Sequence, residues 1–200
     1  MNMMNKIHED KKSIEHIAYI DMNTELPNRN YFHELTHSSS EEMDTLNQKG
    51  ALVFIDFDGF KEINDTYGHR AGDELLFLFA KRLKKYFSLK GNDKKIFLFD
   101  EKTLPKEIPA RLGGDEFVIL FRDISNELEV KIKIEKLFKD VFSEYELYGN
   151  VKIKLEGSAG VAIFPKDGIK YNDILKSADI AMYDAKAAGK NTIRFYKEKS

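Results

Sequence analysis

Residues 111–121 read RLGGDEFVILF, and this stretch decides the fold class. Apolar residues lie on both sides of Gly113-Gly114, and glycine permits the positive φ angles that a tight hairpin turn needs. The stretch therefore predicts two antiparallel strands around a glycine turn. Asp115 and Glu116 fall where the second of these strands begins.

Hydrophobic periodicity supplies the remaining elements. We expect strands over residues 51–55, 151–155, 161–164 and 192–196, and helices over 28–35, 75–87, 126–145 and 171–187. Turns are expected over 64–72 and 157–160. Insertions are expected over 36–50 and 88–109, the second with a short strand at 96–99. Asn126 and Glu129 fit a capping pair for the helix that follows them. Without the insertions, the order is β-α-β-β-α-β plus a helix and a strand. This order indicates an α+β, ferredoxin-like or palm fold with an antiparallel central sheet and helices.

The fold makes a spatial prediction about acidic residues. Its third strand lies between the first two and runs antiparallel to the first, so Asp56, after the strand 51–55, should meet Asp115. With Glu116 beside them, these carboxylates form an all-oxygen pocket suited to Mg²⁺. Either aspartate alone would fit a turn residue equally well, but the pair beside two glycines favours a metal site.

Composition excludes several classes of protein. The chain has 200 residues, 42% of them apolar and 33% charged, which is typical of one soluble globular domain. A net charge of −2 argues against a nucleic-acid-binding protein. There is no cysteine for disulfides or thiolate zinc sites, and no long uncharged run for a membrane span. We expect a cytoplasmic domain without membrane contact.

The first 20 residues are set apart from the rest. Residues 6–20 carry a weak amphipathic pattern that fits a helix connecting to something upstream, or equally a docked or frayed terminal helix. We therefore divide the chain into a connector helix, 1–20, and a main domain, 21–200.

Three lysines are candidates for binding phosphate groups. Lys61 lies in the turn over residues 58–64, where a helix N-terminus would cradle a phosphate. Lys186 and Lys190 lie one turn apart near the end of the last helix and could clamp a triphosphate. The alternative for all three is an ordinary solvated lysine, which at the helix end would complement the dipole.

Polar residues around a glycine-rich segment suggest base recognition. Asn64 and Asp73 can together match the O6 acceptor and the N1 and N2 donors of guanine, although Asp73 could equally cap a helix. His69 has no second histidine or cysteine nearby and is expected to be a polar contact rather than a metal ligand.

The segment 111–117 resembles the signature loop of the GGDEF family, the diguanylate cyclases. The likeness extends to residues 21–29, 54–76, 157–162 and 179–191 and so covers nearly all of 21–196. The resemblance implies a homodimer in which each subunit binds one GTP, and two GTP form cyclic di-GMP. An upstream sensory or receiver domain, or a partner protein, is implied as well.

The resemblance also implies roles for individual residues. Asp56, Asp115 and the main-chain carbonyl of Phe57 would bind two Mg²⁺ ions per active site, with Mn²⁺ as a substitute. Glu116 would support this cluster, and Asp115 or a metal-bound hydroxide would help to deprotonate the attacking 3′-hydroxyl. The loop itself would be formed by Gly113, Gly114 and Phe117. Nucleotide contacts would come from the residues already singled out, namely Asn64, His69, Asp73, Lys61, Lys186 and Lys190.

Two departures from the family pattern affect regulation and local geometry. Leu104 and Glu107 stand where many relatives have an Arg and an Asp that bind product, so we expect no product inhibition through that site. Glu25 stands where a glycine is usual. Two alternatives to a cyclase are a non-catalytic GTP-binding signalling module and a polymerase-like palm. The intact signature loop argues against the former, and the lack of a basic stripe against the latter.

Overall fold

The computed structural model describes residues 18–36, 49–88 and 105–197. Its strands are β1 (Gly50–Phe57), β2 (Glu107–Gly113), β3 (Glu116–Phe121), β4 (Glu144–Leu147), β5 (Val151–Lys154), β6 (Gly157–Phe164) and β7 (Ile193–Phe195). Its named helices are α3 (Phe60–Tyr67), α4 (His69–Tyr86), α5 (Glu127–Val141) and α6 (Tyr171–Ala187), and residues 29–36 form a further helix.

The strands build one main sheet with the order β2-β3-β1-β6-β7, and β4 pairs with β5 in a separate two-stranded sheet. As predicted, β3 lies between β1 and β2 and runs antiparallel to both. The pairing of β1 with β6 is also antiparallel, whereas β7 runs parallel to β6. These relations confirm the α+β fold of the ferredoxin-like or palm type.

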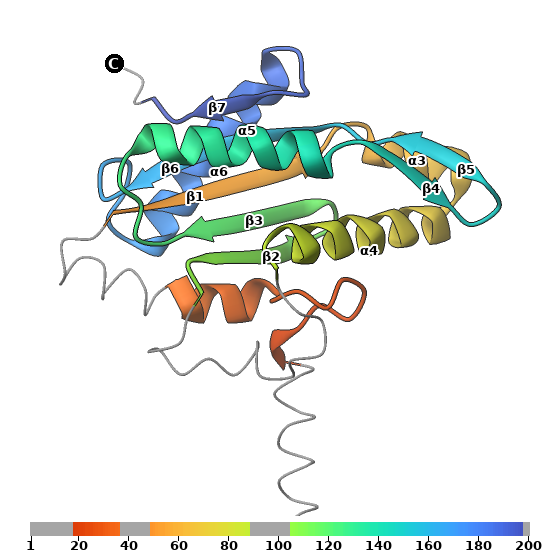
Figure 1. Cartoon of the computed structure of the whole chain (residues 1–200), viewed down its shortest axis with the longest axis horizontal. Helices are drawn as coiled ribbons and strands as arrows, with labels where there is room; N and C mark the ends of the chain where they lie inside the picture. Colours follow the sequence, from red (N-terminus) through yellow and green to blue (C-terminus); the bar gives the residue numbers. More distant parts are fainter. Residues whose placement is uncertain (1–17, 37–48, 89–104, 198–200) are drawn as a thin grey trace, which may run out of the picture.

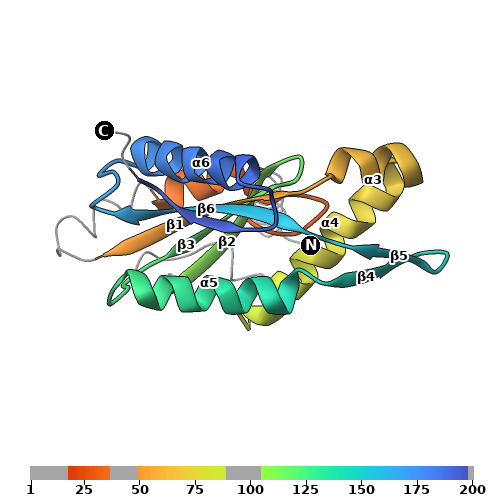
Figure 2. The ribbon, with the colours of Figure 1, turned by 90° about the horizontal axis from the view of Figure 1, so that it is seen from above.

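Helices cover both faces of the main sheet, so the molecule has three layers (Figures 1 and 2). Side chains of a strand alternate between faces, and β1 supplies both cores in this way. Val53 and Ile55 belong to the core with α4 and α5. Leu52 and Phe54 belong to the core with α6 and the helix 29–36. β1 is therefore buried on both sides, and its end is held rigidly in the fold.

The predicted turn at 157–160 is wrong, because these residues begin strand β6. Their small size reflects close packing rather than a turn. A Cβ atom at Gly160 would lie 2.0 Å from the main-chain oxygen of Ala178 in α6. A Cβ atom at Gly157 would lie 2.3 Å from the ring of Phe142. At Gly160, β6 thus passes beneath α6 with no room for a side chain.

Other element boundaries also need correction. The helix predicted over 126–145 ends at Val141, because residues 144–147 pair with β5. The strand predicted at 151–155 is therefore part of the small hairpin and not of the main sheet. The segment 64–72 is helical except at Gly68, whose φ of 85° separates α3 from α4. Residues 107–109, assigned to an insertion, belong to β2.

Several predictions lie outside the described residues. They concern residues 1–17 of the connector helix, 37–48 of the first insertion, and the strand proposed at 96–99. The division into a connector and a main domain accordingly stays a prediction. Among the described helices, none has the length and apolar character that crossing a bilayer requires.

Candidate functional site

The predicted acidic residues gather at one end of the main sheet. Asp56, near the end of β1, lies opposite Glu116 of β3 on one side and Ser158 of β6 on the other. Asp115 occupies the turn that leads from β2 into β3. The turn has glycines at positive φ, 147° for Gly113 and 52° for Gly114. The antiparallel pairing therefore brings together the three carboxylates that the sequence predicted would meet.

Aromatic packing holds the two strand ends in place. The ring of Phe57 stacks on that of Phe117, with centroids 5.4 Å apart, and both rings contact Phe79 of α4. All three rings are buried. The main-chain carbonyl of Phe57 and the carboxylates beside it thus rest on rigid elements, as a preorganised site requires.

Burial and mutual repulsion weaken the acidity of the cluster. Burial raises the pKa of Asp115 to about 6, and the negative charge of Asp56 adds to this effect. Burial also raises the pKa of Asp56, although Lys186 opposes the shift, and that of Glu116, although Arg29 opposes it. A cation placed among these groups would relieve the repulsion that their ionisation creates.

Lys186 of α6 supplies part of that positive charge through an ion pair with Asp56. Within the described part of the chain, no three carboxylate or imidazole groups converge on a single point as a finished metal site. Mg²⁺ does not need such a site, since it commonly uses one or two carboxylates together with water and substrate phosphates. The donors provided by Asp56, Asp115 and the Phe57 carbonyl fit that requirement.

Two arginines that sequence reasoning did not assign to the site brace the signature loop. The guanidinium of Arg111 donates to the main-chain oxygen of Gly114 at 2.8 and 3.0 Å and to Asp21 at 2.9 Å. Arg29 donates to Glu116 at 3.3 Å. Both arginines lie within the motifs that carry the family resemblance, but their partners across the fold are visible only in three dimensions.

Two further aspartates belong to this region. Asp58 accepts hydrogen bonds from the hydroxyl of Ser158 at 2.9 and 3.0 Å and from the main-chain N–H of Asn191 at 2.8 Å. It therefore ties the segment after β1 to β6 and to the loop before β7. The negative charge of Asp179 on α6 contributes to the raised pKa values of Asp56 and Glu116.

The candidate guanine contacts lie at the corner between α3 and α4. Asn64 packs closely against Gly72: a Cβ atom added at Gly72 would lie 2.0 Å from the side-chain oxygen of Asn64. Asp73 is exposed on the first turns of α4, and its main-chain oxygen accepts a hydrogen bond from Asn23 at 3.0 Å. His69, also exposed, is the first residue of α4.

The remaining candidates are not joined to the acidic cluster. Lys61 is exposed on α3, and Lys190 is exposed in the loop after α6. No hydrogen bond or ion pair among residues 18–36, 49–88 and 105–197 links Lys61, Lys190 or His69 to Asp56 or Asp115. Lys186 is thus the one lysine of the three that the structure brings to the carboxylates.

At the position of the product-inhibition site, Leu104 falls outside the described residues. Glu107, the other member of that pair, opens β2 and forms an ion pair with Lys133 of α5 at 3.1 Å. Its carboxylate is therefore engaged within the fold. Absence of product inhibition through this site stays a prediction.

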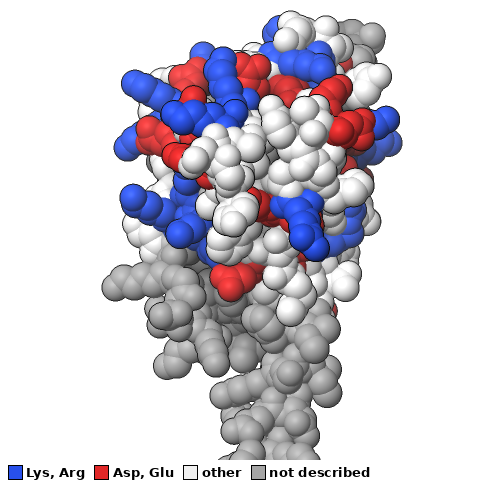
Figure 3. Space-filling view, turned by 90° about the vertical axis from the view of Figure 1, so that its right-hand side faces the viewer, with Lys and Arg blue, Asp and Glu red and all other residues white. Residues whose placement is uncertain are grey.

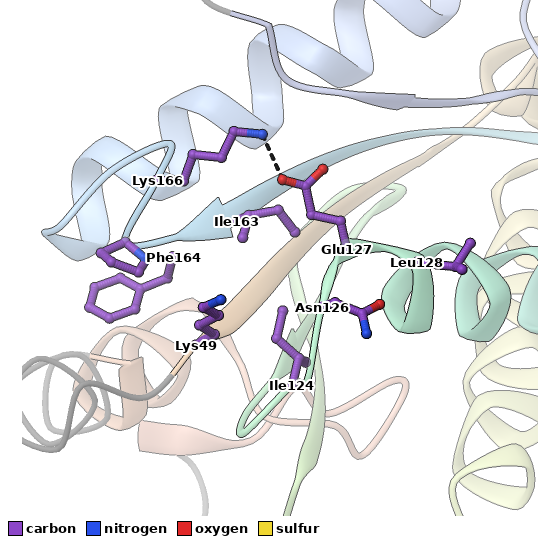
Figure 4. Close-up of a pocket in the computed structure, with 9 residues that line it drawn as sticks. Lys49, Ile124, Asn126, Glu127, Leu128, Ile163, Phe164 and Lys166 are labelled. Atoms are coloured by element: carbon purple, nitrogen blue, oxygen red, sulfur yellow. Dashed lines mark hydrogen bonds and ion pairs between the residues drawn. The ribbon is translucent and has the colours of Figure 1, made fainter.

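A cavity of about 570 Å³ lies at the other end of the sheet, where β1 begins and β6 ends (Figure 4). Its walls are mainly apolar, with Lys49 and an ion pair between Lys166 and Glu127 at 2.6 Å. Because the acidic cluster lies at the opposite end of β1, this cavity is separate from the candidate site.

The side of the molecule that carries α3 and the β4–β5 hairpin shows basic and acidic groups interspersed, without a continuous basic stripe (Figure 3).

The chain thus has a palm-like sheet with carboxylates at the ends of adjacent antiparallel strands. The model of the family described as "Diguanylate cyclase, GGDEF domain" matches residues 18–95 and 98–192. The chain belongs to the GGDEF family.

Curated relatives agree with this assignment. The chain is 33% identical over 196 residues to the signaling protein YkoW of Bacillus subtilis, covering 96% of this chain and 22% of the relative. It is 31% identical over 180 residues to MucR of Pseudomonas aeruginosa, a bifunctional diguanylate cyclase/cyclic di-GMP phosphodiesterase, covering 90% of this chain and 24% of the relative. The chain thus spans about a quarter of the length of these two proteins.

A solved structure agrees as well. The GGDEF domain of TpbB from Pseudomonas aeruginosa superposes with a TM-score of 0.76 at 27% identity, covering 90% of this chain and 95% of that one.

Proposed function

We propose that this chain is a diguanylate cyclase that condenses two GTP molecules into cyclic di-GMP and two pyrophosphates. The observation that carries the proposal is the juxtaposition of Asp56, Asp115 and Glu116 at the end of the central strands, with Lys186 beside them. Family membership supports the same reaction. In each of the two steps, a 3′-oxygen bonds to the α-phosphorus of the other GTP, and the bond to the β-phosphate breaks to release pyrophosphate.

The chain's own residues would bind the nucleotide and accept its proton. Asp115 would accept the proton of the 3′-hydroxyl, and a carboxylate with a pKa of about 6 is mostly ionised above neutral pH. Lys186 would hold phosphate oxygens, as would Lys61 on α3 and Lys190 in the loop after α6. Asn64 and Asp73 would recognise guanine, with His69 near the nucleotide.

Asp56, Asp115 and the Phe57 carbonyl would hold two Mg²⁺ ions, and Mn²⁺ has the same oxygen preference. When bound, the ions would offset negative charge on the triphosphate and on the departing pyrophosphate. Glu116 would add charge to the cluster, while its bond to Arg29 keeps the start of β3 in place.

One GTP per subunit requires two subunits that face each other, so we propose that the active unit is a homodimer. A turnover rate per subunit that rises with protein concentration would support this. An upstream domain or partner that controls dimerisation is part of the same proposal.

The test is incubation of the purified chain with GTP and Mg²⁺ over a concentration series, with mass spectrometry for cyclic di-GMP. Asp115→Asn should abolish product, whereas Asp123→Asn, an exposed change outside the cluster, should not. If the wild-type chain forms no product even under forced dimerisation, the cyclase proposal fails. Calorimetry that then showed GTP binding would identify a non-catalytic GTP-binding module.

A further inference from the structure

One contact connects the N-terminal segment to the candidate guanine site. The side-chain amide of Asn23 donates a hydrogen bond to the main-chain oxygen of Asp73 at 3.0 Å, across 50 positions of sequence. Asp73 belongs to the first turns of α4, and its side chain is a proposed guanine contact. Asn23 does not belong to the acidic cluster and has no part in the proposed chemistry.

The donor is held by a rigid turn. Asp21 accepts hydrogen bonds from the main-chain N–H of Thr24 at 2.9 Å and from its hydroxyl at 2.7 Å, and Thr24 is fully buried. The main-chain N–H of Asp21 donates a hydrogen bond to the main-chain oxygen of Leu26 at 2.9 Å. Because Asp21 also binds Arg111, the turn that presents Asn23 is anchored to the main sheet. The exposed hydrogen bond from the Asn23 side chain thus links an anchored turn to Asp73.

The acceptor lies in the first turns of α4, a helix that begins without a side-chain cap. The N-cap of α4 is Gly68, which has no side chain to cap the helix. The start of α4 packs on the core through Leu75 and Leu76, and three other segments of the chain also contact it. These contacts are the packing of Asn64 on Gly72, the bond from Asn23 to Asp73, and a bond from the main-chain N–H of Tyr148 to Glu74 at 3.0 Å.

We propose that Asn23 is a positioning residue that determines the selectivity for guanine over adenine through the placement of Asp73. The proposal rests on the proposed function only in its assignment of Asp73 to guanine. A carboxylate that accepts from both N1–H and N2–H of guanine needs accurate placement, because both bonds weaken when it moves. Adenine has no N2 amino group and no N1–H, so its binding does not depend on that placement.

The test measures binding, by calorimetry, of GTP and ATP analogues with a methylene group between the α- and β-phosphorus atoms, which cannot react. We expect Asn23→Ala to weaken the guanine analogue about three- to tenfold, the effect of one hydrogen bond, and to leave the adenine analogue unchanged. Asn23→Asp keeps the size but places an acceptor against the Asp73 carbonyl, so its loss should be at least as large. Glu25→Gln, in the same turn but in contact with Lys84, is the matched control and should change neither affinity.

A double-mutant cycle separates positioning from general destabilisation. In an Asp73→Ala background, Asn23→Ala should cause no further loss for the guanine analogue. Equal weakening of both analogues, additive losses in the cycle, or an unchanged guanine affinity in both Asn23 variants would overturn the proposal. A wild-type chain that prefers neither base would overturn it too, whatever the cyclase assay shows. If the chain prefers guanine but forms no cyclic di-GMP, only the proposal of cyclase activity is refuted.

Discussion

Lys186 of α6 forms an ion pair with Asp56 at the end of β1, 130 positions away in the sequence. The lysine lowers the pKa of both Asp56 and Asp115, against the effect of their burial. It therefore belongs to the acidic cluster even before a nucleotide is considered. A single residue thus connects the last helix to both carboxylates proposed to hold magnesium.

Replacement of Lys186 by Met should weaken substrate binding and catalysis together. Methionine keeps an unbranched side chain but removes the ammonium group that would hold phosphate. We expect the KM for GTP to rise and kcat/KM to fall about tenfold or more, equivalent to about 1.4 kcal/mol or more. Steady-state kinetics at saturating Mg²⁺ would measure both. Lys176→Met, an exposed change on the same helix, should leave them unchanged. An unaltered KM in Lys186→Met would remove the lysine from the proposed phosphate site.

The raised pKa of Asp115 predicts how stability depends on pH in the presence of a metal chelator. The carboxyl has a pKa of about 6 in the folded chain and 3.8 as its ordinary value. Between these values the folded state binds more protons than the unfolded state, so stability falls as pH rises from about 4 to about 6 and stays lower above that. Urea unfolding across this range should show the decline.

Asp115→Asn removes this titration. The variant should exceed the wild type in free energy of unfolding by about 1 kcal/mol at pH 8, a value discounted for solvent screening, and the difference should vanish near pH 4. Asp123→Asn should show no comparable gain. Mg²⁺ should stabilise the wild type more at pH 8 than at pH 5, because it binds the ionised carboxylates. Equal wild-type and Asp115→Asn curves at every pH would contradict the account of the cluster.

The strand order and the meeting of the carboxylates could be predicted from sequence because each follows from a local pattern and a topological rule. The run before Asp56 is apolar and short, and RLGGDEFVILF contains its own turn. Given the β-α-β-β-α-β order, the pairing of the first and third strands follows, and the observed register places Asp56 opposite Glu116, the residue after Asp115. The capping pair was also visible, because its two residues are only three positions apart: Asn126 accepts from the N–H of Glu129 at 3.0 Å.

The errors arose where tertiary packing overrides local preference. Gly157 and Gly160 resemble turn residues, but they lie in a strand. Glycine is needed at these positions because the ring of Phe142 and main-chain atoms of α6 occupy the space that a side chain would need. The bond from Arg29 to Glu116 of the signature loop and the bond from Arg111 of that loop to Asp21 each span more than 80 positions. No periodicity or spacing rule identifies such partners.

The close approach of β6 to α6 predicts a severe effect of Gly160→Ala. The added Cβ atom would lie 2.0 Å from the Ala178 oxygen and 2.1 Å from the Met182 nitrogen, both main-chain atoms of α6. Because a helix backbone cannot rotate aside as a side chain can, we expect a loss of about 3 kcal/mol in the free energy of unfolding. Gly59→Ala, in the left-handed conformation with φ 79° and ψ 20°, would bring the added atom no closer than 3.4 Å to the Glu62 side chain and should cost only about 1 kcal/mol. Similar losses at the two sites in urea denaturation would contradict this reading of the packing.

Glu25 provides a final prediction, because it stands at a position where the chain departs from the family's usual glycine. Its φ is 55°, which is unfavourable for a residue with a Cβ atom, and its carboxylate forms an ion pair with Lys84 at 3.0 Å. Glu25→Ala loses the ion pair and keeps the strain, whereas Glu25→Gly loses both. We therefore expect the glycine variant to exceed the alanine variant by about 1 kcal/mol in free energy of unfolding, the reverse of the usual order. At Asn150, with a φ of 60°, the same comparison of Gly with Ala supplies a second positive-φ site without the Lys84 ion pair, and glycine should again be favoured. If alanine proved the more stable at position 25, the backbone there could not have the left-handed conformation, and the turn that presents Asn23 would have to differ as well.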